Sequence, residues 1–229
     1  MRFFNVYQYV APAVLFPISY LFWLRRMGGD HRLVLLMLSV PVVFAYVIPA
    51  LGTNWLRLWE FNTRLRLGRF RPHHGFVFGS ATSLIALVCV TPRPPAPDAF
   101  DLFRTAFVLG SVLAFWNWLY DVRAIQAGFI TVYNRPYAER RGPAAIATDY
   151  APALFGSFGV CYGLAIRWGE YALLDQRRWD AYGALLAGTN LAGLVIPVLA
   201  YVGASYLKHG TSGLKPCAIA GEPEKQPRG

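Results

Sequence analysis

The chain contains long stretches with almost no charged residues, and these are separated by short polar segments. A helix needs about 17–25 apolar residues to cross a hydrocarbon core about 30 Å thick. Six stretches approach that length, and we interpret each as a helix because backbone groups in lipid must hydrogen-bond within their own segment. The stretches are residues 3–24, 33–51, 75–90, 102–120, 150–166 and 181–207. The pattern predicts an all-α, polytopic membrane protein with about six transmembrane helices over residues 1–208, followed by a flexible cytoplasmic tail at residues 209–229.

The composition excludes two other classes of protein. Of the 229 residues, 55% are hydrophobic and only 15% are charged, whereas soluble domains carry about 25% charged residues. A soluble single domain is therefore not expected. A mainly disordered chain is not expected either, because so much apolar surface would collapse.

The distribution of basic residues predicts the orientation in the membrane. With six spans, both termini lie on one side, and that side carries 14 Lys and Arg residues against 8 on the other. Cytoplasmic loops carry the excess of basic residues, so we expect both termini in the cytoplasm and the protein in a bacterial inner membrane. Anionic lipid head groups account for the net charge of +10, so no nucleic-acid partner is predicted.

The two longest loops on that side share an order of residue types. Each contains a Trp, then an acidic residue, then an Asn and an Arg-rich stretch, so that Glu60 corresponds to Asp121 and Asn62 to Asn134. This order suggests an internal repeat of three plus three helices. Sites in such membrane proteins lie near the interface between the repeats.

Three carboxylates are the predicted catalytic residues: Asp121, Glu60 and Asp149. An acidic side chain near the apolar core is costly unless it is paired or hydrated, which makes Asp121 a functional candidate. Each also has a plainer interpretation. Asp121 is then a solvated helix end, Glu60 pairs with a nearby arginine, and Asp149 caps the helix that we expect to begin beside it.

Polar and aromatic side chains near these carboxylates are the predicted substrate-binding residues. Asn117 lies four residues before Asp121 and therefore on the same helical face. Arginines of the first loop offer donors for a phosphate or another anionic head group. The full predicted set is Asn117, Asn62, Asn134, Arg64, Arg69, Arg71, Trp116 and Tyr120.

Motifs for metals and cofactors are missing from the sequence. The three cysteines form no C-x-x-C pair, and no phosphate-binding glycine loop or hydrolase motif occurs. No cofactor is predicted. His73 and His74 are the strongest metal candidates, but they are adjacent and would share one ion only from a loop. The favoured interpretation is that they are interfacial histidines and that no metal binds.

One segment resembles a known family. The pattern Asp121-x-x-Ala124-Ile125-x-x-Gly128-x-Ile130 resembles the loop after a helix in the lycopene cyclase domain of bacteria and fungi. The following segment, Ile146-Ala-Thr-Asp149-Tyr150, is similar to that family's acidic motif before its next helix. The resemblance covers about thirty residues and implies a small membrane protein built from helical repeats. The family's adjacent glutamate pair is replaced here by Thr148 and Asp149, so what the resemblance implies is the fold and not the same cyclisation.

Three functions remain open from the sequence. The first is a membrane-embedded enzyme that acts on a lipophilic isoprenoid or lipid substrate by carboxylate acid/base chemistry at the cytoplasmic interface. The second is an accessory subunit of a larger membrane complex, which would contact its partners through the small-residue faces Gly159/Gly163 or Gly188/Ala192. The third is a small transporter.

Overall fold

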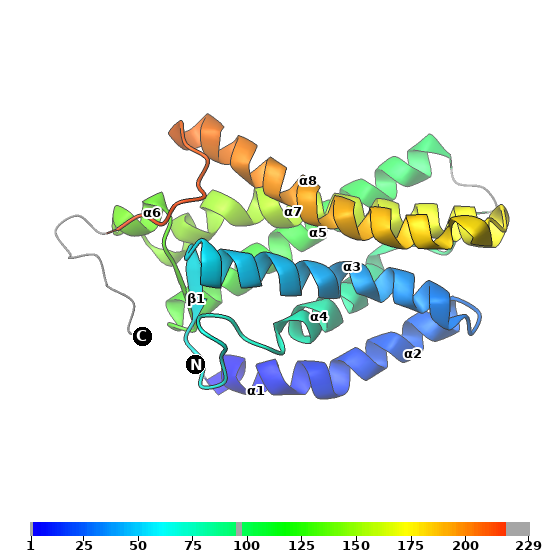
Figure 1. Cartoon of the computed structure of the whole chain (residues 1–229), viewed down its shortest axis with the longest axis horizontal. Helices are drawn as coiled ribbons and strands as arrows, with labels where there is room; N and C mark the ends of the chain where they lie inside the picture. The colour runs from blue at the N-terminus through cyan, green and yellow to red at the C-terminus, as the bar shows by residue number, and fades with distance from the viewer. Residues whose placement is uncertain (1, 95–97, 219–229) are drawn as a thin grey trace.

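The protein folds into a bundle of long helices with a two-stranded antiparallel sheet at one end (Figure 1). The computed structural model describes residues 2–94 and 98–218, so most of the predicted tail, from residue 219 onward, lies outside the described residues. The helices are α1 (Arg2–Val10), α2 (Phe16–Arg26), α3 (His31–Ala50), α4 (His74–Cys89), α5 (Ala99–Gln126), α6 (Arg135–Ala138), α7 (Pro143–Glu170) and α8 (Tyr182–His209), and the strands are β1 (Trp59–Phe61) and β2 (Ile130–Val132).

The first predicted helix is continuous but irregular. A π-helical turn, Ala11–Leu15, joins α1 to α2. Pro12 and Pro17 lie at the starts of that turn and of α2. A proline has no N–H to donate to the preceding turn, and helices accommodate this with local bulges or kinks. The sequence prediction of a helix over residues 3–24 is therefore confirmed as one helical segment.

Four helical segments within the described residues are long and apolar enough to cross a membrane: Arg2–Arg26, His31–Trp55, Ala99–Gln126 and Trp179–His209. The remaining two predicted stretches are also helical, but α4 has only 16 residues, and α7 is rich in small and polar residues. Large apolar side chains on the outer faces of α5 and α8 are exposed, among them Phe103 and Leu199. Such exposed apolar faces are typical of helices in contact with lipid.

The helix α7 is central in the bundle and packs most closely against α5. A β-carbon at Gly159 would lie 2.6 Å from the carbonyl oxygen of Leu109, and one at Gly163 would lie 3.0 Å from that of Thr105. The Gly159/Gly163 face is therefore occupied by α5 within the chain, which corrects the expectation that it serves a partner subunit. The Gly188 position on α8 has no atom within 4 Å of such a β-carbon, so only the Gly188/Ala192 face stays open.

A two-stranded sheet joins the two polar loops that share an order of residue types. Strand β1 pairs antiparallel with β2, with Trp59 opposite Val132 and Phe61 opposite Ile130. Asn62 extends the pairing, because its side chain donates to the Gly128 carbonyl at 3.0 Å. Since β1 follows α3 and β2 follows α5, the sheet brings the ends of these two helices together.

The first helix begins, and the last helix ends, at the end of the bundle that carries the two-stranded sheet. In Figure 1, α1 begins and α8 ends at this end. Residues after α8 fold back onto it. The Tyr201 hydroxyl donates to the Gly213 carbonyl at 2.9 Å, and the Cys217 amide donates to the Tyr133 carbonyl at 2.7 Å. The beginning of the predicted tail therefore contacts the bundle.

Candidate functional site

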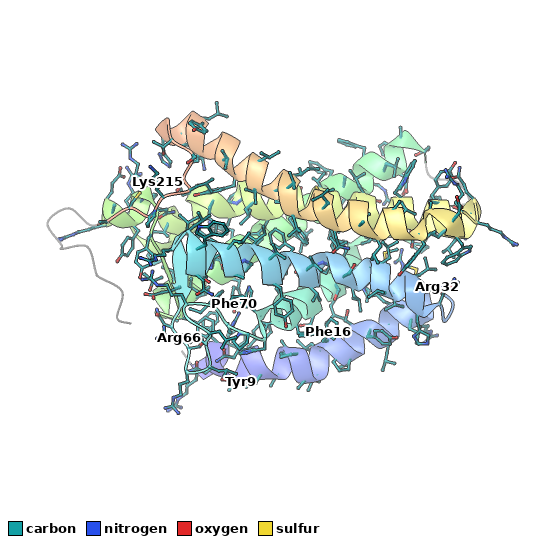
Figure 2. All side chains as sticks on the ribbon, in the orientation of Figure 1. Tyr9, Phe16, Arg32, Arg66, Phe70 and Lys215 are labelled. Carbon is teal, nitrogen blue, oxygen red and sulfur yellow. The ribbon has the colours of Figure 1, made fainter. Side chains whose placement is uncertain are left out.

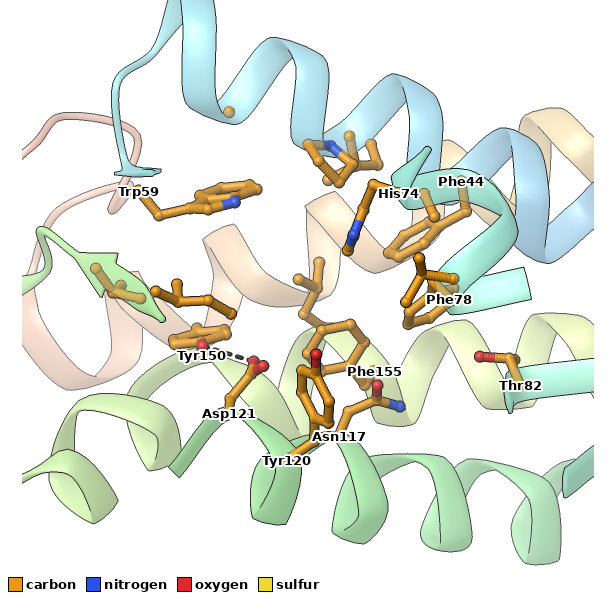
Figure 3. Close-up of a pocket in the computed structure, with 18 of the residues that line it drawn as sticks. Phe44, Trp59, His74, Phe78, Thr82, Asn117, Tyr120, Asp121, Tyr150 and Phe155 are labelled. Atoms are coloured by element: carbon orange, nitrogen blue, oxygen red, sulfur yellow. Dashed lines mark hydrogen bonds between the residues drawn. The ribbon is translucent and has the colours of Figure 1, made fainter. Parts of the chain in front are cut away.

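A cavity of about 750 Å³ lies at this end of the bundle, between α3, α4, α5, the beginning of α7 and the two-stranded sheet. Its lining is mainly apolar and aromatic. Figure 3 shows Trp59 and His74 on one side and Asn117, Tyr120 and Asp121 on the other. The volume lies within the range of about 300–1,000 Å³ that is usual for small-molecule sites.

The lining of the cavity includes residues at the surface of the molecule. Val88 on α4 and Trp116 on α5 both line it and are among the exposed large apolar side chains.

Asp121 is the acidic residue that lines this cavity. It lies near the end of α5 and is only 8% exposed. Its Oδ2 accepts a hydrogen bond of 2.6 Å from the hydroxyl of Tyr150 on α7 (Figure 3). Asp121 is therefore a buried residue and not a solvated helix end. Its partner is a tyrosine rather than an arginine of the first loop.

The other two predicted catalytic carboxylates have partners elsewhere and do not line the cavity. Glu60 accepts a hydrogen bond of 2.5 Å from Tyr133, and it forms no ion pair with an arginine in the described part of the chain. Burial, together with this bond to Glu60, raises the pKa of Tyr133, which keeps its hydroxyl protonated and able to donate.

Asp149 is tied to the end of α8. Its Oδ1 lies 2.6 Å from Nε2 of His209, and its Oδ2 accepts from the amide of Asn134 at 3.1 Å. The helix α7 begins at Pro143, so Asp149 lies inside that helix and does not cap it. The predicted group of three carboxylates therefore does not meet in one cavity.

The three predicted asparagines serve different local structures. Asn117 lines the cavity and donates to the Leu113 carbonyl of its own helix at 2.9 Å. Asn134 also lines the cavity while it caps α6. Asn62 lies outside the lining and donates to Gly128 and Thr131, which ties the end of β1 to β2.

Of the three predicted arginines, one lines the cavity and two do not. Arg71 is fully buried and lines the cavity. Arg64 is exposed, and Arg69 is partly exposed with its backbone amide bound to Asn54. Of the predicted aromatic residues, both Trp116 and Tyr120 line the cavity.

His73 and His74 face different surroundings. The ring of His74 lines the cavity and contacts Arg71, whereas the ring of His73 stacks on Tyr9 with centroids 5.2 Å apart. Burial and the charge of Arg71 lower the pKa of His73 to about 4. The described residues contain no group of three side chains suited to hold a metal ion.

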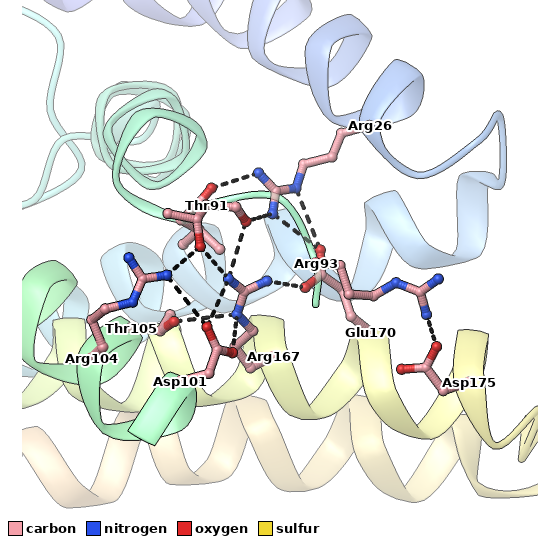
Figure 4. A network of polar contacts seen from close by, with 10 residues as sticks. Arg26, Thr91, Arg93, Asp101, Arg104, Thr105, Arg167, Glu170 and Asp175 are labelled. Atoms are coloured by element: carbon pink, nitrogen blue, oxygen red, sulfur yellow. Dashed lines mark hydrogen bonds and ion pairs between the residues drawn. The ribbon is translucent and has the colours of Figure 1, made fainter. Parts of the chain in front are cut away.

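Sequence reasoning missed Tyr150 as the partner of Asp121 and missed a second polar cluster at the opposite end of the bundle (Figure 4). In this cluster Arg167 is 1% exposed and contacts Glu170 and Asp101, each at 2.9 Å. Arg26 donates to the Val90 carbonyl at 2.8 Å and lies 3.3 Å from Glu170. The cluster joins α2, α5 and α7 with the segment that follows α4.

A scan of the chain against protein-family models, a search of curated proteins and a search of solved structures all found no match. The geometry of the cavity and the chemistry of its lining residues are therefore the observations from which a function can be inferred.

Proposed function

We propose that the protein is a membrane-embedded enzyme that acts on a lipophilic substrate, an isoprenoid or another lipid, with Asp121 as the acid/base residue. The observation that carries this proposal is the Asp121–Tyr150 pair in the wall of a largely apolar cavity of about 750 Å³. Buried charged side chains are normally paired, as Asp101 is with Arg167. Asp121 lacks such a partner among the described residues.

The arrangement suits proton transfer to or from an apolar substrate. Tyr150 holds one carboxyl oxygen of Asp121, while Oδ1 has no hydrogen-bond partner in the described part of the chain. A positioned carboxyl group typically contributes 10²–10⁴-fold to the rate of such a step. Asn117 and Tyr120, on the same face of α5, would orient the substrate. Glu60 and Asp149 would support the site through Tyr133 and Asn134, which line it.

The proposed topology has six spans, with both termini in the cytoplasm of a bacterium and the cavity at the cytoplasmic interface. The helix α7 is surrounded by protein over much of its length, so it does not need the hydropathy of a lipid-facing helix. The 16 residues of α4 extend about 24 Å at 1.5 Å per residue, which is somewhat short of a hydrocarbon core of about 30 Å. The three-plus-three repeat and the likeness to the lycopene cyclase domain belong to the same proposal.

The test compares lipid extracts of bacteria that produce the wild-type protein, the Asp121→Asn variant or no protein. We expect mass spectrometry to detect a converted isoprenoid or other lipid only with the wild type, at equal protein levels in the membrane. A wild-type extract identical to that of cells without the protein, in a host rich in isoprenoids, would argue against the enzyme.

An accessory role is a second candidate because one observation favours it. The small-residue face of α8, with Gly188 and Ala192, lines a groove of about 480 Å³. Close packing of a partner helix needs such a face. Purification in mild detergent distinguishes the two, because a stable complex with another membrane protein that Gly188→Leu disrupts would favour the accessory role.

A further inference from the structure

One arginine of the loop before α4 is buried with no counter-ion in the described part of the chain. The side chain of Arg71 is 0% exposed. Burial lowers the pKa of Arg71, which is the direction expected for a cation without a negative partner. No carboxylate of the described residues lies within 4.0 Å of it. Buried charges are nearly always paired, and among the described residues the environment of Arg71 lacks a negative group.

The hydrogen bonds of Arg71 are also incomplete. Its Nη2 lies 2.5 Å from Nδ1 of His74, and because a guanidinium can only donate, this histidine nitrogen accepts. Nε and Nη1 have no hydrogen-bond partner among the described residues. The hydroxyl of Tyr120 lies beside the guanidinium and stabilises its charge as an acceptor. The O–H group of Tyr120 and the unused N–H groups of Arg71 remain available to an acceptor on a ligand.

Aromatic rings stabilise the faces of the guanidinium but not its edge. The Cζ atom lies 4.7 Å from the ring centroid of Phe61 and 5.2 Å from that of Phe129. Cation–π contacts of this kind hold a charged group in place. They leave the in-plane N–H groups free to donate, so the side chain is positioned while Nε and Nη1 remain without a partner among the described residues.

These donors lie in the wall of the cavity that contains Asp121. Arg71, His74, Tyr120 and Tyr7 all line it, and most of the other lining residues are apolar. The cavity therefore offers a cationic, hydrogen-bonding position together with a long apolar volume. This combination matches a molecule with an anionic head and an apolar tail.

We propose that Arg71 binds the carboxylate or phosphate head group of an amphiphilic ligand whose apolar tail occupies the cavity beside Asp121. The planar guanidinium suits both head groups, because the second N–H of Nη2 lies parallel to one on Nε or Nη1 and such a pair binds two oxygens at once. The inference rests on the proposed function, since it names the substrate class as an anionic amphiphile.

The experiment measures binding to the purified full-length protein in nanodiscs of phosphatidylcholine, which carry no net charge. The probes are dodecyl phosphate, dodecanol and inorganic phosphate, and calorimetry gives the dissociation constants. We expect the wild type to bind dodecyl phosphate at least tenfold more tightly than dodecanol and more tightly than inorganic phosphate. In Arg71→Met, dodecyl phosphate should bind about as weakly as dodecanol, while dodecanol binding is unchanged.

Two further variants control the interpretation. Arg123→Met removes an exposed charge at the end of α5 and should keep the preference for dodecyl phosphate, which distinguishes a specific site from general attraction to a basic face. Arg71→Lys keeps the charge but loses the paired donors, so an intermediate affinity is expected. It gives the same test if Arg71→Met does not fold.

The proposal is overturned if the wild type binds dodecanol and dodecyl phosphate equally, if inorganic phosphate binds as tightly as dodecyl phosphate, or if neither Arg71 variant weakens binding. The outcome is independent of turnover. The measurement records binding without conversion, so failure of the acid/base role and failure of the anion site give different results.

Discussion

Two buried arginines in this protein have opposite surroundings. Arg167 contacts two carboxylates and a threonine, whereas Arg71 contacts a histidine and two aromatic rings. A fully paired charge is already satisfied and serves the fold. A positioned but unpaired charge is available to a ligand. The same residue type therefore stabilises one end of the bundle and equips the cavity at the other.

The role of Arg167 in the fold can be tested directly. In Arg167→Met, the carboxylates of Glu170 and Asp101 lose their buried partner, and removal of one member of a buried ion pair costs about 3–5 kcal/mol. We expect a loss of this size in the free energy of unfolding, measured in detergent. Arg178→Met removes an arginine of the exposed Arg178–Asp180 pair and should change stability by less than about 1 kcal/mol. Equal effects of the two variants would contradict a structural role for the cluster.

The sequence identifies some of these residues but not their partners. Asp121 stands out because an acidic residue near the membrane interface is costly. Its partner, Tyr150, is 29 positions away on another helix and has no distinguishing pattern of its own. Arg64, Arg69 and Arg71 belong to one basic stretch, and only the folding of the loop over Phe61 buries the third of them.

At the scale of the helices, the contact between α5 and α7 depends on glycine. The backbones approach so closely at Gly159 that even a β-carbon would meet Leu109 and Gly110. Gly188 on α8 provides a matched position, because it is also a helical glycine but has open space around it.

We therefore expect opposite effects from two alanine substitutions. Gly159→Ala should destabilise the protein by about 1–3 kcal/mol through overpacking. Gly188→Ala should be neutral or stabilise it by up to about 1 kcal/mol, because alanine favours the helix. Thermal unfolding in the same detergent gives the comparison. A Gly159→Ala protein as stable as the wild type would mean that α5 and α7 separate easily.

The helices are largely predictable from the sequence, but the two-stranded sheet is not. Long apolar stretches determine helices in lipid, and all six predicted stretches are helical. Each strand of the sheet has only three residues, and about 70 positions separate the two strands. A segment of three residues is too short for a periodicity that would indicate a strand. The positions of Glu60 and Asn62 depend on this pairing, so they could not be predicted from the sequence.

At the scale of the whole molecule, basic side chains lie at both ends of the bundle, and the proposed topology assigns the two ends to opposite sides of the membrane. Figure 2 shows Arg66 and Lys215 at the end with the cavity and Arg32 at the other end. The proposed cytoplasmic side is the cavity end. It would therefore face an anionic inner leaflet that attracts basic residues.

Cysteine labelling tests this orientation. In a cysteine-free background, Arg64→Cys lies near the cavity and Arg178→Cys at the opposite end. A membrane-impermeant maleimide added to intact spheroplasts should label Arg178→Cys and should reach Arg64→Cys only after permeabilisation. The reverse pattern would invert the proposed topology and move the cavity to the outer leaflet.

The central claim is that Asp121 performs acid/base chemistry in the cavity. The most direct test is the initial rate of substrate conversion by purified protein in nanodiscs, using the lipid identified from the extracts. We expect Asp121→Asn to lower the rate at least about 100-fold. Glu139→Gln, at an exposed position near α6, should leave it within twofold of the wild type. A rate for Asp121→Asn equal to that of the wild type would contradict acid/base chemistry at Asp121.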